Sequence, residues 1–400
     1  MHRVVARGLT VVVALVLART APAVELVPNA EAVKMTSRIL GEERTILVST
    51  PRGYDQGSGR YPVLYLTDGD SHFLHTRGTV DFLVRNGLMP DVVIVGVMNT
   101  DRTRDLTPTK GYALQLNGAR VPLESSGGAG KFLDFFEKEL IPWVEGTYRT
   151  VPYRVFAGHS LGGLFALTSL VEKPGLFDAS IAASPSLAWD DDVILGKMAK
   201  LLERRKELRY TLFVTMANEE EGDPSPTRFE QLRKLLKRTK ASGFAWGAEL
   251  MADEDHGSVV LRSHYYGLRK IFEGWRLPRE RNAGGTPGTV DDLKKHYGQL
   301  SERFGYVVPV PELTVNQIGY QHLLRKDARG ALPFFRWNVE LYPESANVHD
   351  SLGEALETAG KDAEALASYE KAVEIAKRAS DARLEVFVRN RDRMAAAVGK

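Results

Sequence analysis

Short apolar segments that alternate with helical patterns constrain the fold of this chain more than any other sequence feature does. Strands are expected within 37–50 and at 63–70, 91–99, 153–158, 179–184, 210–218 and 246–253. Fully apolar strands that end in turns are typical of a sheet buried on both faces. Helical patterns separate most of them, at 130–148, 160–173, 191–208, 226–242 and 259–275. The pattern predicts an α/β fold, with a mostly parallel central sheet and helices on both faces.

The amino terminus has the pattern of a secretory signal peptide. A basic start precedes the apolar stretch 9–17, which is too short to span a bilayer. Ala21 and Ala23 then form an A-x-A cleavage pattern. We expect cleavage near Ala23, so that residues 1–23 are removed and the mature protein has no membrane span. An uncleaved membrane anchor is the alternative.

Composition excludes several classes of protein. The 400 residues carry a formal net charge of +2, which does not call for nucleic acid or an anionic membrane as partner. The chain has no cysteine, which excludes disulfides, thiolate nucleophiles and cysteine-based metal sites. Export without disulfides favours a periplasmic or secreted bacterial protein.

The sequence "VFAGHSLGGLFAL" (155–167) places Ser160 in a G-x-S-x-G motif between a strand and a helix. That context matters, because a sharp strand-to-helix turn lifts the serine hydroxyl clear of the sheet. Gly158 and Gly162 stand where side chains would crowd the turn, and the helix N-terminus faces a developing oxyanion. We predict that Ser160 is a nucleophile; a plain Gly-rich turn is the alternative.

A serine nucleophile needs a base, and in this type of fold the order along the chain is serine, acid, histidine. His256 lies in a polar loop between the last strand and the last helix, and we expect it to be that base. Glu219 is the leading candidate for the acid because it is nearest the end of the strand 210–218. Glu220 and Asp223 are alternatives, as is a Ser–His dyad without an acid.

The predicted oxyanion hole consists of two backbone N–H groups. We expect one from Leu161, which follows the nucleophile, and the other from the loop after "VLYLTDG" (63–69), with Asp70 as the leading candidate. A metal site in "DGDSH" (68–72) is the weaker alternative, because its spacing matches no recognised ligand set. No metal or cofactor is expected.

Five segments together resemble the esterase family of the α/β-hydrolase superfamily, with ferric enterobactin esterases, esterase D and feruloyl esterases as relatives. They are "YPVLYLTDGDSHF", "NTDRTRDLTPT", "YRVFAGHSLGGLFAL", "SPSLAWDD" and "DHGSVV". The resemblance covers roughly Ser37 to Trp275. It implies the α/β-hydrolase fold and ester hydrolysis through an acyl-enzyme, with Ser160 as nucleophile and His256 as base.

Three residues are candidates for substrate binding. Trp189 stands in "SLAWD", where relatives often have two adjacent tryptophans, and either lines the acyl pocket or only packs. Arg102 and Arg104 are candidates for binding an anionic substrate group. Ion pairs with Asp101 and Asp105 are the alternative for both arginines.

The last quarter of the chain has a different sequence pattern from the rest. A Pro-, Gly- and Arg-rich linker, 276–289, leads into an all-helical pattern with an internal repeat. Matching residues 34 positions apart are Ile318-Gly319 and Leu352-Gly353, Ala331 and Ala365, and Phe335 and Tyr369. The spacing resembles tetratricopeptide repeats. Two coincidentally amphipathic helix pairs are the alternative.

The sequence therefore predicts an exported serine carboxylic ester hydrolase acting on a small-molecule ester. Its expected parts are a signal peptide (1–23), a hydrolase domain (30–276), a linker with a helix (277–311) and helical repeats (312–400) that bind a peptide or protein partner or dock on the hydrolase domain. The alternative functions are an acyltransferase on the same fold and a repeat-mediated binding protein with a non-catalytic hydrolase domain.

Overall fold

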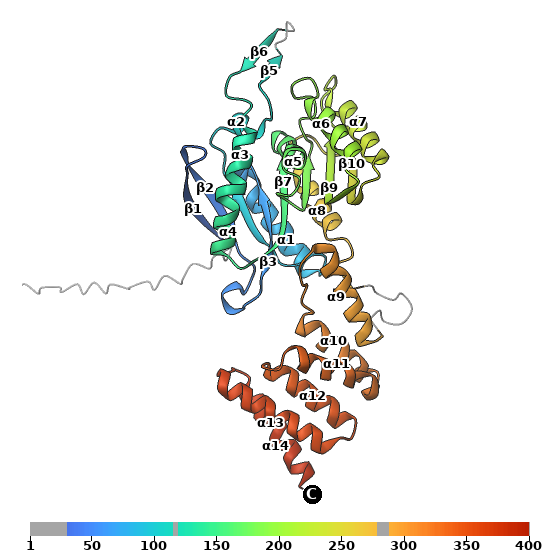
Figure 1. Ribbon diagram of the computed structural model, residues 1–400. Coiled ribbons are helices and arrows are strands. Elements are labelled where there is room, and N and C mark those ends of the chain that lie inside the picture. The colour runs from blue at the N-terminus through green and yellow to red at the C-terminus, as the bar shows by residue number, and fades with distance from the viewer. Residues whose placement is uncertain (1–29, 115–118, 278–287, 400) are drawn as a thin grey trace, which may run out of the picture.

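An eight-stranded sheet forms the centre of the structure, a computed structural model that describes residues 30–114, 119–277 and 288–399 (Figure 1). The predicted signal peptide lies outside the described residues. The strand order is β1-β2-β4-β3-β7-β8-β9-β10. The bounds are β1 (Ala30–Ser37), β2 (Glu42–Ser49), β3 (Tyr61–Leu66), β4 (Val93–Val97), β7 (Thr150–His159), β8 (Ala179–Ala183), β9 (Glu207–Ala217) and β10 (Ser242–Met251).

Most of this sheet is parallel. β4, β3, β7, β8, β9 and β10 run in one direction, and at one edge β2 pairs in antiparallel fashion with both β4 and β1. The carboxyl ends of the parallel strands therefore meet at one edge of the sheet, where open α/β sheets place their ligand sites. The predicted fold class is confirmed.

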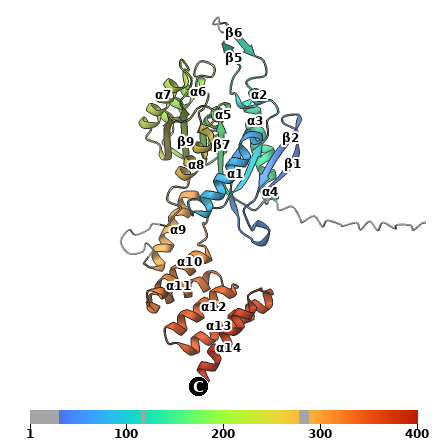
Figure 2. The ribbon, with the colours of Figure 1, turned by 180° about the vertical axis from the view of Figure 1, so that it is seen from behind.

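Helices cover both faces because successive strand residues point to opposite sides. Tyr65 belongs to the buried core that includes residues of α3–α7, whereas Leu64 belongs to the core that includes residues of α1 and α8. The arrangement of these helices around the sheet can be followed in Figures 1 and 2. The bounds are α1 (Gly69–Arg85), α3 (Ala129–Phe135), a π-helical segment η2 (Phe136–Leu140), α4 (Ile141–Thr147), α5 (Leu161–Glu172), α6 (Val193–Arg204), α7 (Ser225–Arg238) and α8 (Val259–Ile271).

The segment after β3 differs from the prediction. A strand was expected over 63–70, but β3 ends at Leu66 and α1 begins at Gly69. Asp68, with φ 54° and ψ 41°, turns the chain between them in a left-handed conformation. The buried residues Phe73, Val80 and Leu83 then recur at helical spacing. Asp70 consequently lies in the first turn of a helix and not in a loop.

Two further elements after β4 were also not predicted. A short helix, α2 (Arg102–Leu106), leads to an antiparallel hairpin of β5 (Gly111–Leu114) and β6 (Arg120–Leu123). The sequence between the two hairpin strands contains an Asn-Gly pair, a strong hairpin signal that could have revealed them. The hairpin projects beyond one end of the main sheet (Figure 1).

The regular elements found in the described residues after the linker are all helices. They are α9 (Val290–Phe304), α10 (Glu312–Leu324), α11 (Ala328–Leu341), α12 (Ala346–Thr358), α13 (Asp362–Ala379) and α14 (Leu384–Val398). A Cβ on Gly319 would lie 2.7 Å from the ring of Phe335, and one on Gly353 would lie 2.7 Å from the ring of Tyr369. Both helix pairs thus cross closely at the repeated glycine and aromatic positions. None of the helices in the described ranges is long and apolar enough to cross a membrane.

The helical region docks on the α/β domain through a continuous hydrophobic core. Phe304 of α9 packs against Tyr153, Phe272 and Trp275, with ring centroids 5.0, 5.5 and 5.8 Å apart. A hollow of about 1240 Å³ lies between α9–α10 and the starts of β3 and β4. The helices therefore meet the amino-terminal edge of the sheet, away from the edge where the parallel strands end (Figure 1).

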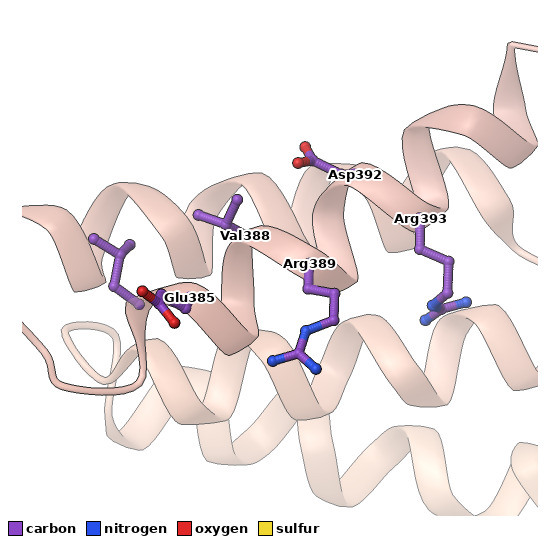
Figure 3. Close-up of a pocket in the computed structure, with 6 residues that line it drawn as sticks. Glu385, Val388, Arg389, Asp392 and Arg393 are labelled. Carbon is purple, nitrogen blue, oxygen red and sulfur yellow. The ribbon is translucent and has the colours of Figure 1, made fainter.

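A second hollow runs along α14 at the far end of the helical region (Figure 3). The side chains of Arg389 and Arg393 extend to the same side of this helix. Arg393 is already paired with Glu357 of α12. Binding of a peptide or protein partner by these helices stays a prediction.

We predict that Phe304→Ala lowers the free energy of unfolding by about 3–5 kcal/mol, because it leaves a cavity in the core shared by α9 and the α/β domain. Val307→Ala is the matched control, since Val307 is 83% exposed. Chemical denaturation of both variants measures the effect. Equal stability of the two variants would contradict the docking of α9.

Candidate active site

Ser160 lies on a strained turn between β7 and α5. Its backbone has φ 58° and ψ −114°, a conformation that non-glycine residues rarely adopt and that costs on the order of 1–3 kcal/mol. The Ser160 N–H donates to the carbonyl of Ala183 (2.9 Å), and the Ser186 N–H donates to the carbonyl of Ser160 (3.1 Å). The β8 end thus holds the turn from both sides, and this is the geometry expected of a nucleophile elbow.

The glycines around Ser160 lie in close contacts that leave little room for a side chain. A Cβ on Gly158 would overlap the carbonyl group of Gly162. A Cβ on Gly162 would lie 2.6 Å from Thr67 Oγ1 and 3.2 Å from Asp68 Oδ2. The start of α5 therefore lies directly against the side chains of Thr67 and Asp68 in the β3–α1 turn.

His256 and Glu219 are hydrogen-bonded to each other. Both carboxylate oxygens of Glu219 lie close to His256 Nδ1, at 2.8 and 3.0 Å. The Glu219 side chain is 8% exposed, whereas His256 is 47% exposed. With Nδ1 donating to the carboxylate, Nε2 is left as the nitrogen that can accept a proton. Of the acids weighed from the sequence, Glu219 is the one brought to His256.

Ser184 fixes the carboxylate of Glu219. Its hydroxyl donates to Glu219 Oε1 at 2.6 Å and accepts from the Ala217 N–H at 3.0 Å. Ser184 is 1% exposed and has a positive φ of 37°. Sequence reasoning missed this residue, because one serine at a strand end carries no distinguishing signal.

Ser160 and His256 lie on neighbouring segments. The ring of His159, the residue before Ser160, is 4.7 Å from the ring of His256. The hydrogen bonds found among the described residues do not include one between the Ser160 hydroxyl and His256. Ser160 Oγ lies 3.4 Å from Ser186 Oγ instead. In enzymes, hydrogen bonds between catalytic groups are often long in the absence of substrate.

The two predicted oxyanion donors stand at two helix starts. Leu161 is the first residue of α5, and Asp70 is the second residue of α1. N–H groups in the first helical turn have no intrahelical acceptor and carry the positive end of the helix dipole. Leu161 directly follows Ser160, and α1 begins after Thr67 and Asp68, whose side chains lie against Gly162 of α5. The role of either N–H as an oxyanion donor stays a prediction.

Arg102 and Arg104 bind carboxylates of the protein itself. Arg102 contacts both oxygens of the buried Asp68 at 2.6 and 3.2 Å, and donates to the His159 carbonyl at 3.0 Å. Arg104 contacts Glu42 at 2.6 Å and Asp105 at 2.7 Å. Arg102 thus ties the segment after β4 to the residue before Ser160, whereas Arg104 ties it to β2. A contact of either arginine with substrate stays a prediction.

Trp189 joins the β8–α6 segment to the β5–β6 hairpin. Its indole N–H donates to the carbonyl of Thr109 at 3.2 Å, and its ring fills the space in which Gly111 lacks a side chain. Asp191 adds a second tie through the Tyr112 hydroxyl at 2.8 Å. Trp189 therefore has a packing role; its contact with an acyl group stays a prediction.

Four other histidines surround the site and were not recognised as a group from the sequence. Burial lowers the pKa of His72, and burial together with neighbouring imidazoles brings the pKa values of His75 and His159 to about 4. Burial lowers the pKa of His264 well below its ordinary value. These rings are neutral at neutral pH. The described residues hold no group of three or more potential ligands placed to bind a metal ion.

Comparisons with known proteins identify the family of this chain. The family described as "Putative esterase" matches residues 37–247. Ferri-bacillibactin esterase BesA of Bacillus subtilis is 33% identical over 53% of this chain and 78% of its own length. Siderophore enterobactin esterase of Emericella nidulans is 34% identical over 49% of this chain and 77% of its own.

A solved structure extends the similarity. The IroE-like serine hydrolase from Shewanella oneidensis is 30% identical, with a TM-score of 0.66 over 78% of this chain and 99% of that one. The chain belongs to the esterase family of the α/β-hydrolase fold and is an ester hydrolase.

The buried histidines predict a loss of stability in acid. The unfolded chain takes up protons on these residues below about pH 6.5, whereas His75 and His159 in the folded chain resist protonation down to about pH 4. The unfolded state therefore binds more protons in this window, and the free energy of unfolding falls as the pH drops from about 6.5 to about 4.

His264→Leu removes one such group, so we expect a shallower decline in melting temperature across this window. His349→Gln, on α12 and outside the cluster, should keep the wild-type slope. Thermal unfolding at several pH values gives both slopes. An unchanged slope in His264→Leu would show that its burial is not linked to acid stability.

Proposed function

We propose that this chain is an exported serine esterase with a Ser160–His256–Glu219 triad. The observation that carries the proposal is the contact of His256 Nδ1 with the Glu219 carboxylate, beside a serine on a strained strand-to-helix turn. This contact favours a triad over the Ser–His dyad, because the carboxylate fixes the tautomer and stabilises the imidazolium that forms in catalysis.

In the acylation step, Ser160 Oγ attacks the ester carbonyl carbon while His256 Nε2 takes the hydroxyl proton. The carbonyl oxygen becomes an oxyanion, which the N–H groups of Leu161 and Asp70 stabilise at the two helix N-termini. The C–O bond to the alcohol then breaks, and His256 returns the proton to the leaving oxygen. The alcohol departs, and the acyl group stays on Ser160 Oγ.

Deacylation repeats these steps with water as the nucleophile. His256 Nε2 takes a proton from water as the water oxygen attacks the acyl carbon. The second tetrahedral oxyanion collapses, the bond to Ser160 Oγ breaks, and Oγ regains the proton from His256. The products are a carboxylic acid and free enzyme.

Siderophore esters are the proposed substrate class. Curated relatives that match half of this chain or more are named as esterases of ferri-bacillibactin and of triacetylfusarinine C. We also propose that residues 1–23 direct export, that residues 30–276 form the catalytic domain, and that the helices after 312 are tetratricopeptide-like repeats joined to it by the linker and α9.

Ser160→Ala is expected to abolish p-nitrophenyl ester turnover while leaving the circular dichroism spectrum and the melting temperature close to wild type. The reason is that the acyl-enzyme cannot form without Oγ. Wild-type turnover by the variant would overturn the assignment. Product analysis with and without an added acceptor alcohol distinguishes a hydrolase from an acyltransferase.

Glu219→Gln is expected to lower kcat by about 10²–10⁴-fold, because the amide neither fixes the His256 tautomer nor stabilises the imidazolium. Glu220→Gln is the matched control, since Glu220 is exposed one residue further on. Steady-state kinetics on one ester compare the two variants. Equal activity of the two variants would contradict the triad and favour a Ser–His dyad.

A further inference from the structure

Five of the nine histidines of this chain gather beside the end of β7. His72 and His75 come from α1, His159 from β7, His256 from the loop before α8, and His264 from α8. Neighbouring rings lie 4.7 to 5.5 Å apart along the series His256, His159, His72, His75 and His264. The series therefore connects the base to the helix that carries a predicted oxyanion donor.

His159 makes the contact that matters most in this series. Its Nε2 donates to the backbone carbonyl of His256 at 2.7 Å. His256 is thus held at two points from two strands: Glu219, after β9, holds the imidazole, and His159, at the end of β7, holds the main chain. The segment around His256 is largely exposed, so these contacts restrict a loop that packing alone does not fix.

His159 is itself held in place through both its main chain and its ring. Arg102 donates to its backbone carbonyl at 3.0 Å, and the same guanidinium binds the buried Asp68. The edge of His72 packs against its ring, with centroids 5.5 Å apart. Burial keeps the pKa of His159 near 4, so the ring donates a hydrogen bond without placing a second positive charge beside the imidazolium of His256.

We infer that His159 is a positioning residue for the base. Its Nε2–H holds the main chain of His256, and this keeps the His256 imidazole within reach of both Glu219 and the nucleophile. His159 directly precedes Ser160 in the chain, so the same residue links the turn of the nucleophile to the loop of the base. The inference rests on the proposed function, in which His256 is the base. A role in packing alone is the competing explanation.

Two amide variants separate these explanations. In His159→Gln the amide nitrogen lies as many bonds from Cα as Nε2 does, so it can reach the His256 carbonyl. In His159→Asn the amide nitrogen is one bond short. We expect His159→Asn to lower kcat on p-nitrophenyl butyrate by about 10- to 100-fold with KM unchanged, and His159→Gln to recover most of the loss.

Wild-type kcat in His159→Asn, or equal losses in both variants, would overturn the inference. Melting temperatures of both variants report whether either one fails to fold. If Ser160→Ala kept the turnover of the wild-type protein, the proposed function itself would be wrong. The two failures are therefore distinguishable.

A second measurement does not depend on turnover. The proton between His256 Nδ1 and Glu219 should give a far-downfield ¹H NMR signal, assigned by its absence in His256→Gln. We expect the signal to persist in wild type and His159→Gln and to be lost through faster exchange in His159→Asn. A signal that is equally sharp in all three proteins would contradict the positioning role.

Discussion

The close contact between two strand-to-helix turns is the constraint on which the site depends. Gly158 and Gly162 let β7 turn into α5 at Ser160, and the same Gly162 lies against Thr67 and Asp68 of the β3–α1 turn. A side chain at Gly158 would overlap the backbone of Gly162, and one at Gly162 would crowd the side chains of Thr67 and Asp68. Ser160 stands between these glycines on a strained backbone, directly before the N-terminus of α5. The electrostatic environment of the proposed chemistry thus follows from packing.

Polar contacts position the proposed base and acid beside these two turns. β7, β9 and β10 end at the same edge of the parallel sheet, so residues far apart in the chain meet there. Ser184 holds Glu219, Glu219 holds the His256 ring, and His159 holds the His256 main chain. The helical region joins the opposite edge through Phe304 and its neighbours, which leaves the proposed site free of it.

Much of this arrangement could be predicted from the sequence, because apolar strands, amphipathic helices and a G-x-S-x-G turn leave local patterns. The location of Glu219 at a strand end favoured it among several neighbouring acids. The helix α1 was missed because the polar start "GDSH" hides its apolar stripe. Ser184 and the histidine series could not be predicted, since their roles arise from contacts between residues distant in the chain. Likewise, no local pattern shows that Arg102 binds Asp68.

Covalent labelling tests the central claim, that Ser160 is a nucleophile activated by its surroundings, most directly. The protein would be treated with a fluorophosphonate probe, digested, and mapped by peptide mass spectrometry. The account predicts stoichiometric modification of the peptide that contains Ser160. Modification of Ser186, whose hydroxyl lies 3.4 Å away, or no modification in a folded and active protein, would contradict it.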